Sequence, residues 1–190
     1  MVLFAAFEVL LFEQAGIARC TLGASSAGRF VRADEALVGN YVSVLPVAGE
    51  VDGAASFETL LKHVKAELLG VYSHAGHAPA LPDANARANA GTPPLFLATF
   101  NMEPETLPPT FGDLRVELAP SPVAHVEFNL MMNVTETARR IVVDLDARAD
   151  VLDASAAARW LDHYREILAR IASFGGSWAP APRQAALASL

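Results

Sequence analysis

Two adjacent serines, Ser25 and Ser26, lie inside the small-residue run Gly-Ala-Ser-Ser-Ala-Gly at residues 23–28. A catalytic serine of the nucleophile-elbow type needs the pattern G-x-S-x-G, because its glycines allow the sharp turn that exposes the hydroxyl. Ala27 stands where the second glycine is required, and no acid-then-histidine order with clear spacing follows. The run also lacks the Gly-Lys-Ser/Thr ending of a phosphate-binding loop. It predicts a tight turn, and a hydrolase using either serine is kept only as a third alternative.

Two histidines, His74 and His77, are spaced as metal ligands on one helical face can be. The glycine and prolines between residues 76 and 82 oppose a helix, and no cysteine or carboxylate stands nearby at ligand spacing. The pair is therefore interpreted as loop histidines. His63 falls on the polar side of a helical pattern and is expected at the surface.

A short acidic stretch is the last candidate for ligand chemistry: Asp144, Asp146, Asp150 and Asp153. A calcium loop would need a central glycine and a closing glutamate, and the stretch has neither. Asp144 and Asp146 fit one face of a strand, and Asp153 fits the N-cap of a helix. No group of residues in the chain thus forms a convincing catalytic centre.

The elements that would position these residues begin with a helix. Apolar side chains surround most of the segment Phe4–Phe12, which predicts a buried helix that ends near Gly16. A short strand over 17–22 is expected to enter the turn at 23–28, and a buried strand is expected over 37–47.

A second helix should start at Ser56, as N-cap, and bury the apolar face that runs from Phe57 to Val71. A long loop at 73–94 follows. Strands are then expected over the segments 95–101, 114–118, 126–133 and 140–146, with a break at 135–137. The final helix should begin near Asp153 and end at Gly175. The sequence predicts an α/β fold in which helices flank a mixed sheet.

Composition and charge narrow the functional classes. The chain has 190 residues, a net charge of −7 and no extended cluster of lysine or arginine, which argues against a nucleic-acid or anionic membrane surface. No apolar run reaches the length of a membrane-spanning helix, and Val2–Phe12 lacks the features of a signal peptide. The single cysteine, Cys20, cannot form an internal disulfide, so a reducing, cytoplasmic compartment is expected.

Several segments resemble, in order, the motifs of one family. Gly23–Arg29 and Gly39–Pro46 are similar to its G-x-x-x-x-G-R turn and its following I-G-x-F-x-N-T-L-P run. Three later segments are similar to N-P-L-F-x-x-x-F-N, K-F-D-L and D-L-F-D: Pro94–Met102, Glu127–Leu130 and Asp150–Asp153. Over nearly its whole length the chain resembles the C-terminal lobe of the condensation domains of nonribosomal peptide synthetases.

This resemblance implies one lobe of a chloramphenicol-acetyltransferase-like fold, whose two lobes enclose a tunnel. Such domains join acyl and aminoacyl thioesters, carried on the phosphopantetheine arms of carrier proteins, into an amide. The family's His-His-x-x-x-Asp-Gly motif belongs to the N-terminal lobe and is absent from this sequence. We therefore expect residues 1–177 to be a partial condensation domain, inactive alone and without a directly bound cofactor, and residues 178–190 to be a Pro/Ala-rich tail or linker.

The resemblance also assigns roles to residues. Arg29 is implied to anchor the two lobes through the aspartate of the missing motif, and without that aspartate it would be unpaired. Ser43, Asn129 and Met131 are implied to face the tunnel. Ser43-Val44 and Asn129 depart from the family pattern, at its Asn-Thr and its Asp. The alternative is a non-catalytic interaction module that self-associates or binds carrier proteins.

Overall fold

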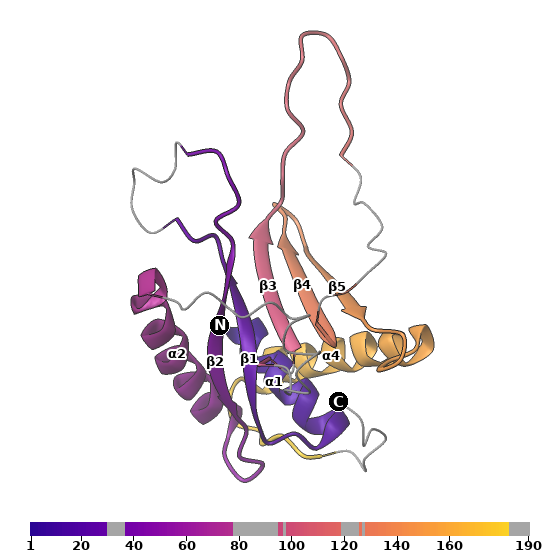
Figure 1. Cartoon of the computed structure of the whole chain (residues 1–190). Helices are drawn as coiled ribbons and strands as arrows, with labels where there is room; N and C mark the ends of the chain where they lie inside the picture. The colour runs from indigo at the N-terminus through magenta and orange to yellow at the C-terminus, as the bar shows by residue number, and fades with distance from the viewer. Residues whose placement is uncertain (30–36, 78–94, 97, 119–125, 127, 183–190) are drawn as a thin grey trace.

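The computed structural model of the chain describes residues 1–182 except 30–36, 78–94, 97, 119–125 and 127. The strands form one sheet in the order β2–β1–β3–β4–β5 (Figure 1). Their bounds are β1 (Arg19–Ser26), β2 (Ser43–Glu50), β3 (Ala98–Pro104), β4 (Leu130–Glu136) and β5 (Ile141–Ala147). β3 runs parallel to both of its neighbours, whereas the outer strands β2 and β5 are antiparallel to theirs. The predicted mixed sheet is confirmed.

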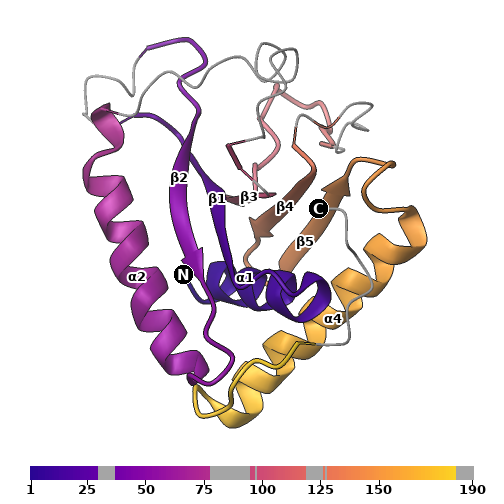
Figure 2. The same ribbon diagram turned by 60° about the horizontal axis from the view of Figure 1, so that its bottom comes forward.

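Three α-helices pack against one face of this sheet, with α1 between α2 and α4 (Figure 2). Their bounds are α1 (Val2–Ala15), α2 (Phe57–Ser73) and α4 (Ala154–Phe174), and a short 3₁₀ helix, η2 (Ala75–His77), follows α2. In the described part of the chain no helix covers the opposite face, which we call the open face.

The core lies between the sheet and the helices. Because side chains alternate along a strand, Leu22 and Ala24 of β1 and Leu130, Met132 and Val134 of β4 point toward the helices and are buried. Helix α1 is buried nearly all round, as its apolar composition predicts.

Phenylalanine rings join the central helix to the central strand. The rings of Phe4 and Phe7 on α1 meet that of Phe100 on β3, with centroids 5.4 and 6.0 Å apart. Burial of each ring contributes roughly 2–3 kcal/mol relative to exposure.

Local signals placed the helix ends correctly. Ser56 caps α2 by accepting a hydrogen bond from the Thr59 amide (3.3 Å), and Asp153 caps α4 by accepting one from the Ala156 amide (2.8 Å). Gly16 ends α1 in the left-handed conformation, with φ of 69°. The three predicted helices are thereby confirmed.

The first two strands differ from the prediction. The expected turn at 23–28 is wrong over most of its length, because β1 continues to Ser26 and pairs there with Ser43. Residues 37–42 are not part of a strand, and β2 runs through Pro46 to Glu50. A proline fits there because β2 is an edge strand, where a missing N–H group can face away from the sheet.

Later strands are also shifted. In place of the strand expected at 114–118, the structure has only an isolated bridge between Phe111 and Leu114. β4 extends into the expected break and ends at Glu136, and the chain then turns where the Thr137 amide donates to the Arg140 carbonyl (2.9 Å). These changes leave the order of strands unaltered.

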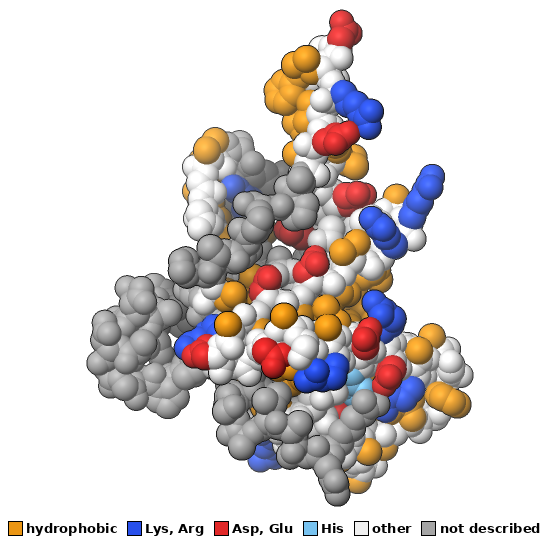
Figure 3. All heavy atoms as spheres, turned by 90° about the vertical axis from the view of Figure 1, so that its right-hand side faces the viewer, with side chains coloured by type: hydrophobic (Ala, Val, Ile, Leu, Met, Phe, Trp, Pro, Cys, Tyr) orange, Lys and Arg blue, Asp and Glu red, His pale blue; other side chains and the backbone are white. Residues whose placement is uncertain are grey.

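The segment 105–118 projects beyond the end of the sheet (Figure 1), and several of its apolar side chains are exposed. Leu107, Phe111 and Leu114 are 60–75% exposed. In the space-filling view from the β5 side, hydrophobic side chains gather near the end of this projection (Figure 3). None of the described helices is long and apolar enough to cross a membrane.

The start of the expected tail packs on the helical layer. The indole of Trp178 stacks on Phe57, with centroids 5.4 Å apart, and the Trp178 carbonyl accepts a hydrogen bond from the Phe57 amide (2.8 Å). The Ala181 amide donates to Glu13 on α1 (3.4 Å). Residues 183–190 lie outside the described part of the chain.

Candidate functional site

The loop after β1 is built around Gly28. Its φ of +67° is in the left-handed region, and a Cβ at this position would lie 1.7 Å from the Tyr41 carbonyl oxygen. The Gly28 amide donates to the Ser26 hydroxyl (3.3 Å). The backbone at Gly28 therefore lies directly against the backbone at Tyr41, and only glycine fits at this position.

The Arg29 side chain is bound by the other side of the same loop. Its guanidinium lies over the Tyr41 ring, 4.7 Å from the centroid, and donates to the Gly39 carbonyl (3.3 Å). The prediction that Arg29 would be unpaired in this chain is wrong, because a ring and a carbonyl of its own loop contact it. The side chain is thus already oriented at the end of β1 from which the loop departs.

We expect Gly28→Ala to lower the free energy of unfolding by about 2 kcal/mol, because it adds both left-handed strain and a backbone clash. Gly112→Ala is the matched control: Gly112 has a φ of +55°, but nothing lies within 4 Å of its added Cβ. Chemical denaturation of both variants measures the difference. Equal losses would show that the contact with Tyr41 contributes nothing.

Polar side chains form a row across three strands of the open face. Asn101 on β3, Asn133 on β4 and Asp146 on β5 point to this face, because the residue before each of them points to the core. Asn101 Nδ2 donates to Asn133 Oδ1 at 3.5 Å, and Asn133 Nδ2 donates to Asp146 Oδ2 at 2.8 Å. We call these three residues the polar row.

Met131 lies beside this row. It pairs in register with Thr99 on one side and Asp146 on the other, and its half-buried side chain is on the open face. Thr99 is 1% exposed, and its hydroxyl has no hydrogen-bond partner in the described part of the protein.

The other two residues predicted to face a tunnel, Asn129 and Ser43, lie outside the polar row. Asn129 precedes β4, and its side chain and carbonyl both accept hydrogen bonds from Arg148 (3.4 and 3.1 Å). Alternation along β2 places Ser43 with Leu45 and Val47, on the helix-facing side. Ser43 and Met131 therefore lie on opposite faces of the sheet.

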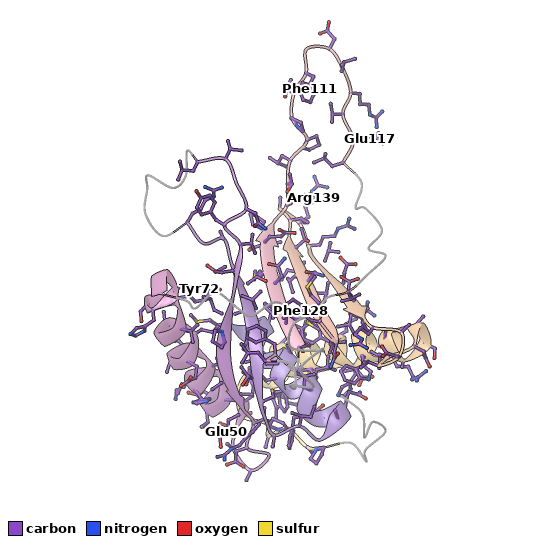
Figure 4. All side chains as sticks on the ribbon, viewed as in Figure 1. Glu50, Tyr72, Phe111, Glu117, Phe128 and Arg139 are labelled. Atoms are coloured by element: carbon purple, nitrogen blue, oxygen red, sulfur yellow. The ribbon has the colours of Figure 1, made fainter. Side chains whose placement is uncertain are left out.

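The residues considered for other chemistry have structural contacts. Ser25 and Ser26 are strand residues, and the Ser25 carbonyl accepts from the Tyr72 hydroxyl (3.0 Å) near the end of α2 (Figure 4). The ring of His74 lies against the Gly70 carbonyl, 2.8 Å from Nδ1. Within the described residues no group of three or more His, Cys, Asp or Glu side chains could hold a metal ion.

A groove of about 520 Å³ lies between the paired ends of β1 and β2 and helix α2, and no residue of the polar row lines it. His63 and Glu67 line it from α2, and Arg19 pairs with Glu50 at its strand side (Nε to Oε1, 2.9 Å). The prediction that His63 is a surface residue is wrong: it is half-buried, and its Nε2 has no hydrogen-bond partner in the described part.

Sequence reasoning missed two buried glutamates on α1. Glu8 and Glu13 are 2% and 1% exposed, and His163 on α4, 2% exposed, meets Glu13 at 2.6 Å. The available signal was the presence of two carboxylates in a segment expected to be buried all round. Neither glutamate reaches the open face, because α1 packs on the other side of the sheet.

Comparison with known proteins gives a consistent result. A family model for the condensation domain matches residues 1–175. Surfactin synthase subunit 1 of Bacillus subtilis is 28% identical over 171 residues, which is 88% of this chain and 5% of that protein. Tyrocidine synthase 3 of Brevibacillus parabrevis is 27% identical over 173 residues, or 88% of this chain and 3% of that protein.

Solved structures share the fold. The condensation domain of the monacolin K polyketide synthase MokA superposes with a TM-score of 0.78 at 16% identity, covering 95% of this chain and 42% of that one. The first condensation domain of the CDA synthetase gives 0.72 at 18% identity, covering 99% and 42%. The chain thus spans less than half of these structures and a small fraction of the curated relatives, and by its family match over residues 1–175 it belongs to the condensation-domain family.

Proposed function

We propose that this chain acts as the C-terminal lobe of a nonribosomal peptide synthetase condensation domain and supplies one wall of the reaction tunnel. The observation that carries the proposal is the one-sided sheet. Helices cover one face, the open face carries the polar row and Met131, and this arrangement corresponds to two fifths of solved condensation domains (42%).

The reaction assigned to such a tunnel is amide formation between two thioesters on the phosphopantetheine arms of carrier proteins. The amine nitrogen of the acceptor attacks the donor thioester carbonyl, the carbon–sulfur bond breaks, the thiol leaves, and the amine loses one proton. The His-His-x-x-x-Asp-Gly motif is absent from this sequence, so the group that handles the proton must come from the other lobe. This chain then forms a wall of the tunnel that helps to orient the substrates, with Met131 and Asn129 as candidate wall residues.

The partner best suited to the exposed end of the molecule is the remaining part of a condensation domain. Two segments present apolar side chains there: residues 37–42, with Val38 and Val42 at least 65% exposed, and the projection at 105–118, with Phe111 at 60% (Figure 4). Apolar surface of this extent is stabilised when a partner covers it. Arg29 lies at the base of the first segment, and a carboxylate from the partner would add an ion pair to its present contacts.

The test is reconstitution from two chains. A separately expressed N-terminal lobe mixed with this chain should form a complex in gel filtration and restore condensation of an acyl thioester with an aminoacyl thioester. Arg29→Ala should weaken the complex at least tenfold, as expected when a bidentate ion pair is lost. Arg139→Ala, at the exposed turn between β4 and β5 (Figure 4), is the matched control and should leave the affinity unchanged.

Absence of both complex and activity would overturn the proposal, and an unchanged affinity of Arg29→Ala would remove the anchor role. The second candidate is a non-catalytic interaction module. It is favoured by one structural neighbour, the X-domain solved in complex with OxyB from teicoplanin biosynthesis, with a TM-score of 0.73 and 19% identity. In that case the chain should bind a carrier protein or self-associate without an N-terminal lobe, and Arg29→Ala should have little effect.

A further inference from the structure

The polar row is directional. At each step an amide NH₂ group donates toward β5, from Asn101 to Asn133 and from Asn133 to Asp146. The row therefore starts at a carboxylate and ends at Asn101 Oδ1, which accepts no hydrogen bond from the described residues. Hydrogen bonds that run in one direction polarise one another, so the negative charge of Asp146 increases the electron density on this last oxygen.

The surroundings of the row add to its negative potential. Glu103 on β3 and Asp144 on β5 occupy strand positions on the same face as Asn101 and Asp146. No lysine or arginine occupies a position in β3, β4 or β5. This half of the open face thus favours a ligand that brings N–H donors or positive charge.

A second unsatisfied group lies next to the row. Thr99 precedes Asn101 by two residues on β3, so the two side chains share the open face about 7 Å apart. The Thr99 hydroxyl is buried and has no hydrogen-bond partner in the described part of the protein. A buried hydroxyl without a partner costs about 1–3 kcal/mol.

We infer that the polar row binds the amine of the acceptor substrate, with Asn101 Oδ1 accepting an N–H bond from it. The inference rests on the proposed function, since it assigns a substrate group to the open face. As the amine attacks the thioester its nitrogen becomes positively charged, so the bond to Asn101 strengthens on the way to the transition state. Asn133 and Asp146 are positioning residues that act through Asn101.

The first experiment needs no condensation activity. The probe is an alanyl thioester of N-acetylcysteamine, and its control is the same compound N-acetylated on the alanyl nitrogen, which has no free amine. Titration followed by NMR should shift the side-chain NH₂ signals of Asn101 and Asn133 with the amine only. Equal shifts with both compounds, or shifts confined to other residues, would overturn the inference.

The second experiment tests, with a conservative change, whether Asp146 acts on Asn101 through Asn133. Asp146→Asn keeps an acceptor for Asn133 but removes the charge, so the Kd of the amine probe should rise about five- to tenfold. Thr135→Ala, on the same face of β4 but outside the row, should leave this Kd unchanged. An Asp146→Asn variant that binds the probe with unaltered affinity would overturn the positioning role of Asp146.

Reconstituted enzyme separates this inference from the proposed function. With an N-terminal lobe present, Asn101→Ala should raise the KM for the acceptor at least fivefold and leave the KM for the donor thioester unchanged. Condensation with unchanged acceptor KM would overturn the inference alone. Probe binding at the row without any reconstituted condensation would support the amine site while overturning the proposed function.

Discussion

Replacing Glu13 with glutamine should lower the free energy of unfolding by about 3 kcal/mol, a large part of the 5–15 kcal/mol typical of a domain. The Glu13 carboxylate is 1% exposed and contacts His163 Nε2 (2.6 Å) and the Arg170 guanidinium (3.0 and 2.6 Å). Glutamine keeps the size of the side chain but removes the charge, so Arg170 loses its carboxylate in a mostly buried site. Urea denaturation followed by circular dichroism measures the loss.

The matched control is Glu58→Gln on α2. Glu58 forms an exposed pair with Lys62 one turn along the helix (2.8 Å), and solvent screens such a pair so that its loss should change stability little. A loss at Glu13 no larger than at Glu58 would contradict the assignment of the buried cluster as a main link between α1 and α4.

The same substitution should loosen the segment after α4. Arg170 connects Glu13 to this segment, because its guanidinium also lies over the Trp178 ring, 4.4 Å from the centroid. When residue 13 is neutral, Arg170 loses its charged partner and its guanidinium is less firmly positioned over Trp178. The stack of Trp178 on Phe57 is then less stable. Acrylamide should quench tryptophan fluorescence more strongly in Glu13→Gln than in the control variant, although Trp160 stays buried in both.

Helix ends were predictable from sequence because their signals are local. A cap such as Ser56 or Asp153 accepts a hydrogen bond from an amide three residues along the chain, so both partners lie within one short stretch of sequence. The Glu13 cluster had no such signal, since Glu13 and His163 are 150 residues apart in sequence. Only the packing of α4 on α1 brings them into contact.

Strand positions were less predictable because pairing decides where a strand starts. Apolar content favoured residues 37–47, but β2 takes its register from β1 and begins at Ser43. A shift of one residue moves every side chain to the other face of a sheet, which is why the face of Ser43 was not predictable. Met131 was assigned by the family resemblance, and the regular alternation along β4 in the structure places it on the open face.

The stability of this protein should fall as the pH rises from 6 to 8, because of Glu8. Burial, together with the charge of Glu67, raises the pKa of Glu8 from 4.5 to about 8. Neither carboxylate oxygen of Glu8 has a hydrogen-bond partner in the described part of the protein. Oε1 packs close to Gly49 of β2, where an added Cβ would lie 3.3 Å from it. Glu8 is therefore mainly protonated in the folded protein at neutral pH.

The sign follows from proton uptake. Between the two pKa values the unfolded chain has lost the Glu8 proton and the folded chain retains it, so each pH unit lowers the free energy of unfolding by about 1.4 kcal/mol. The stabilisation is complete below pH 4.5 and is lost as the pH passes through about 8. Between pH 6 and 8 the expected loss is roughly 2 kcal/mol.

Glu8→Gln should remove this dependence, since a glutamine has the same shape and no proton to lose. Urea midpoints at pH 6, 7, 8 and 9 should decline for the natural sequence and stay level for the variant, which becomes the more stable protein at pH 9. Glu67→Gln is the intermediate case: it removes the charge that adds to burial, so the decline should persist but be complete at a lower pH. Parallel curves for the natural sequence and Glu8→Gln would show that Glu8 is ionised in the folded protein, and burial of α1 would then require a counter-charge for it.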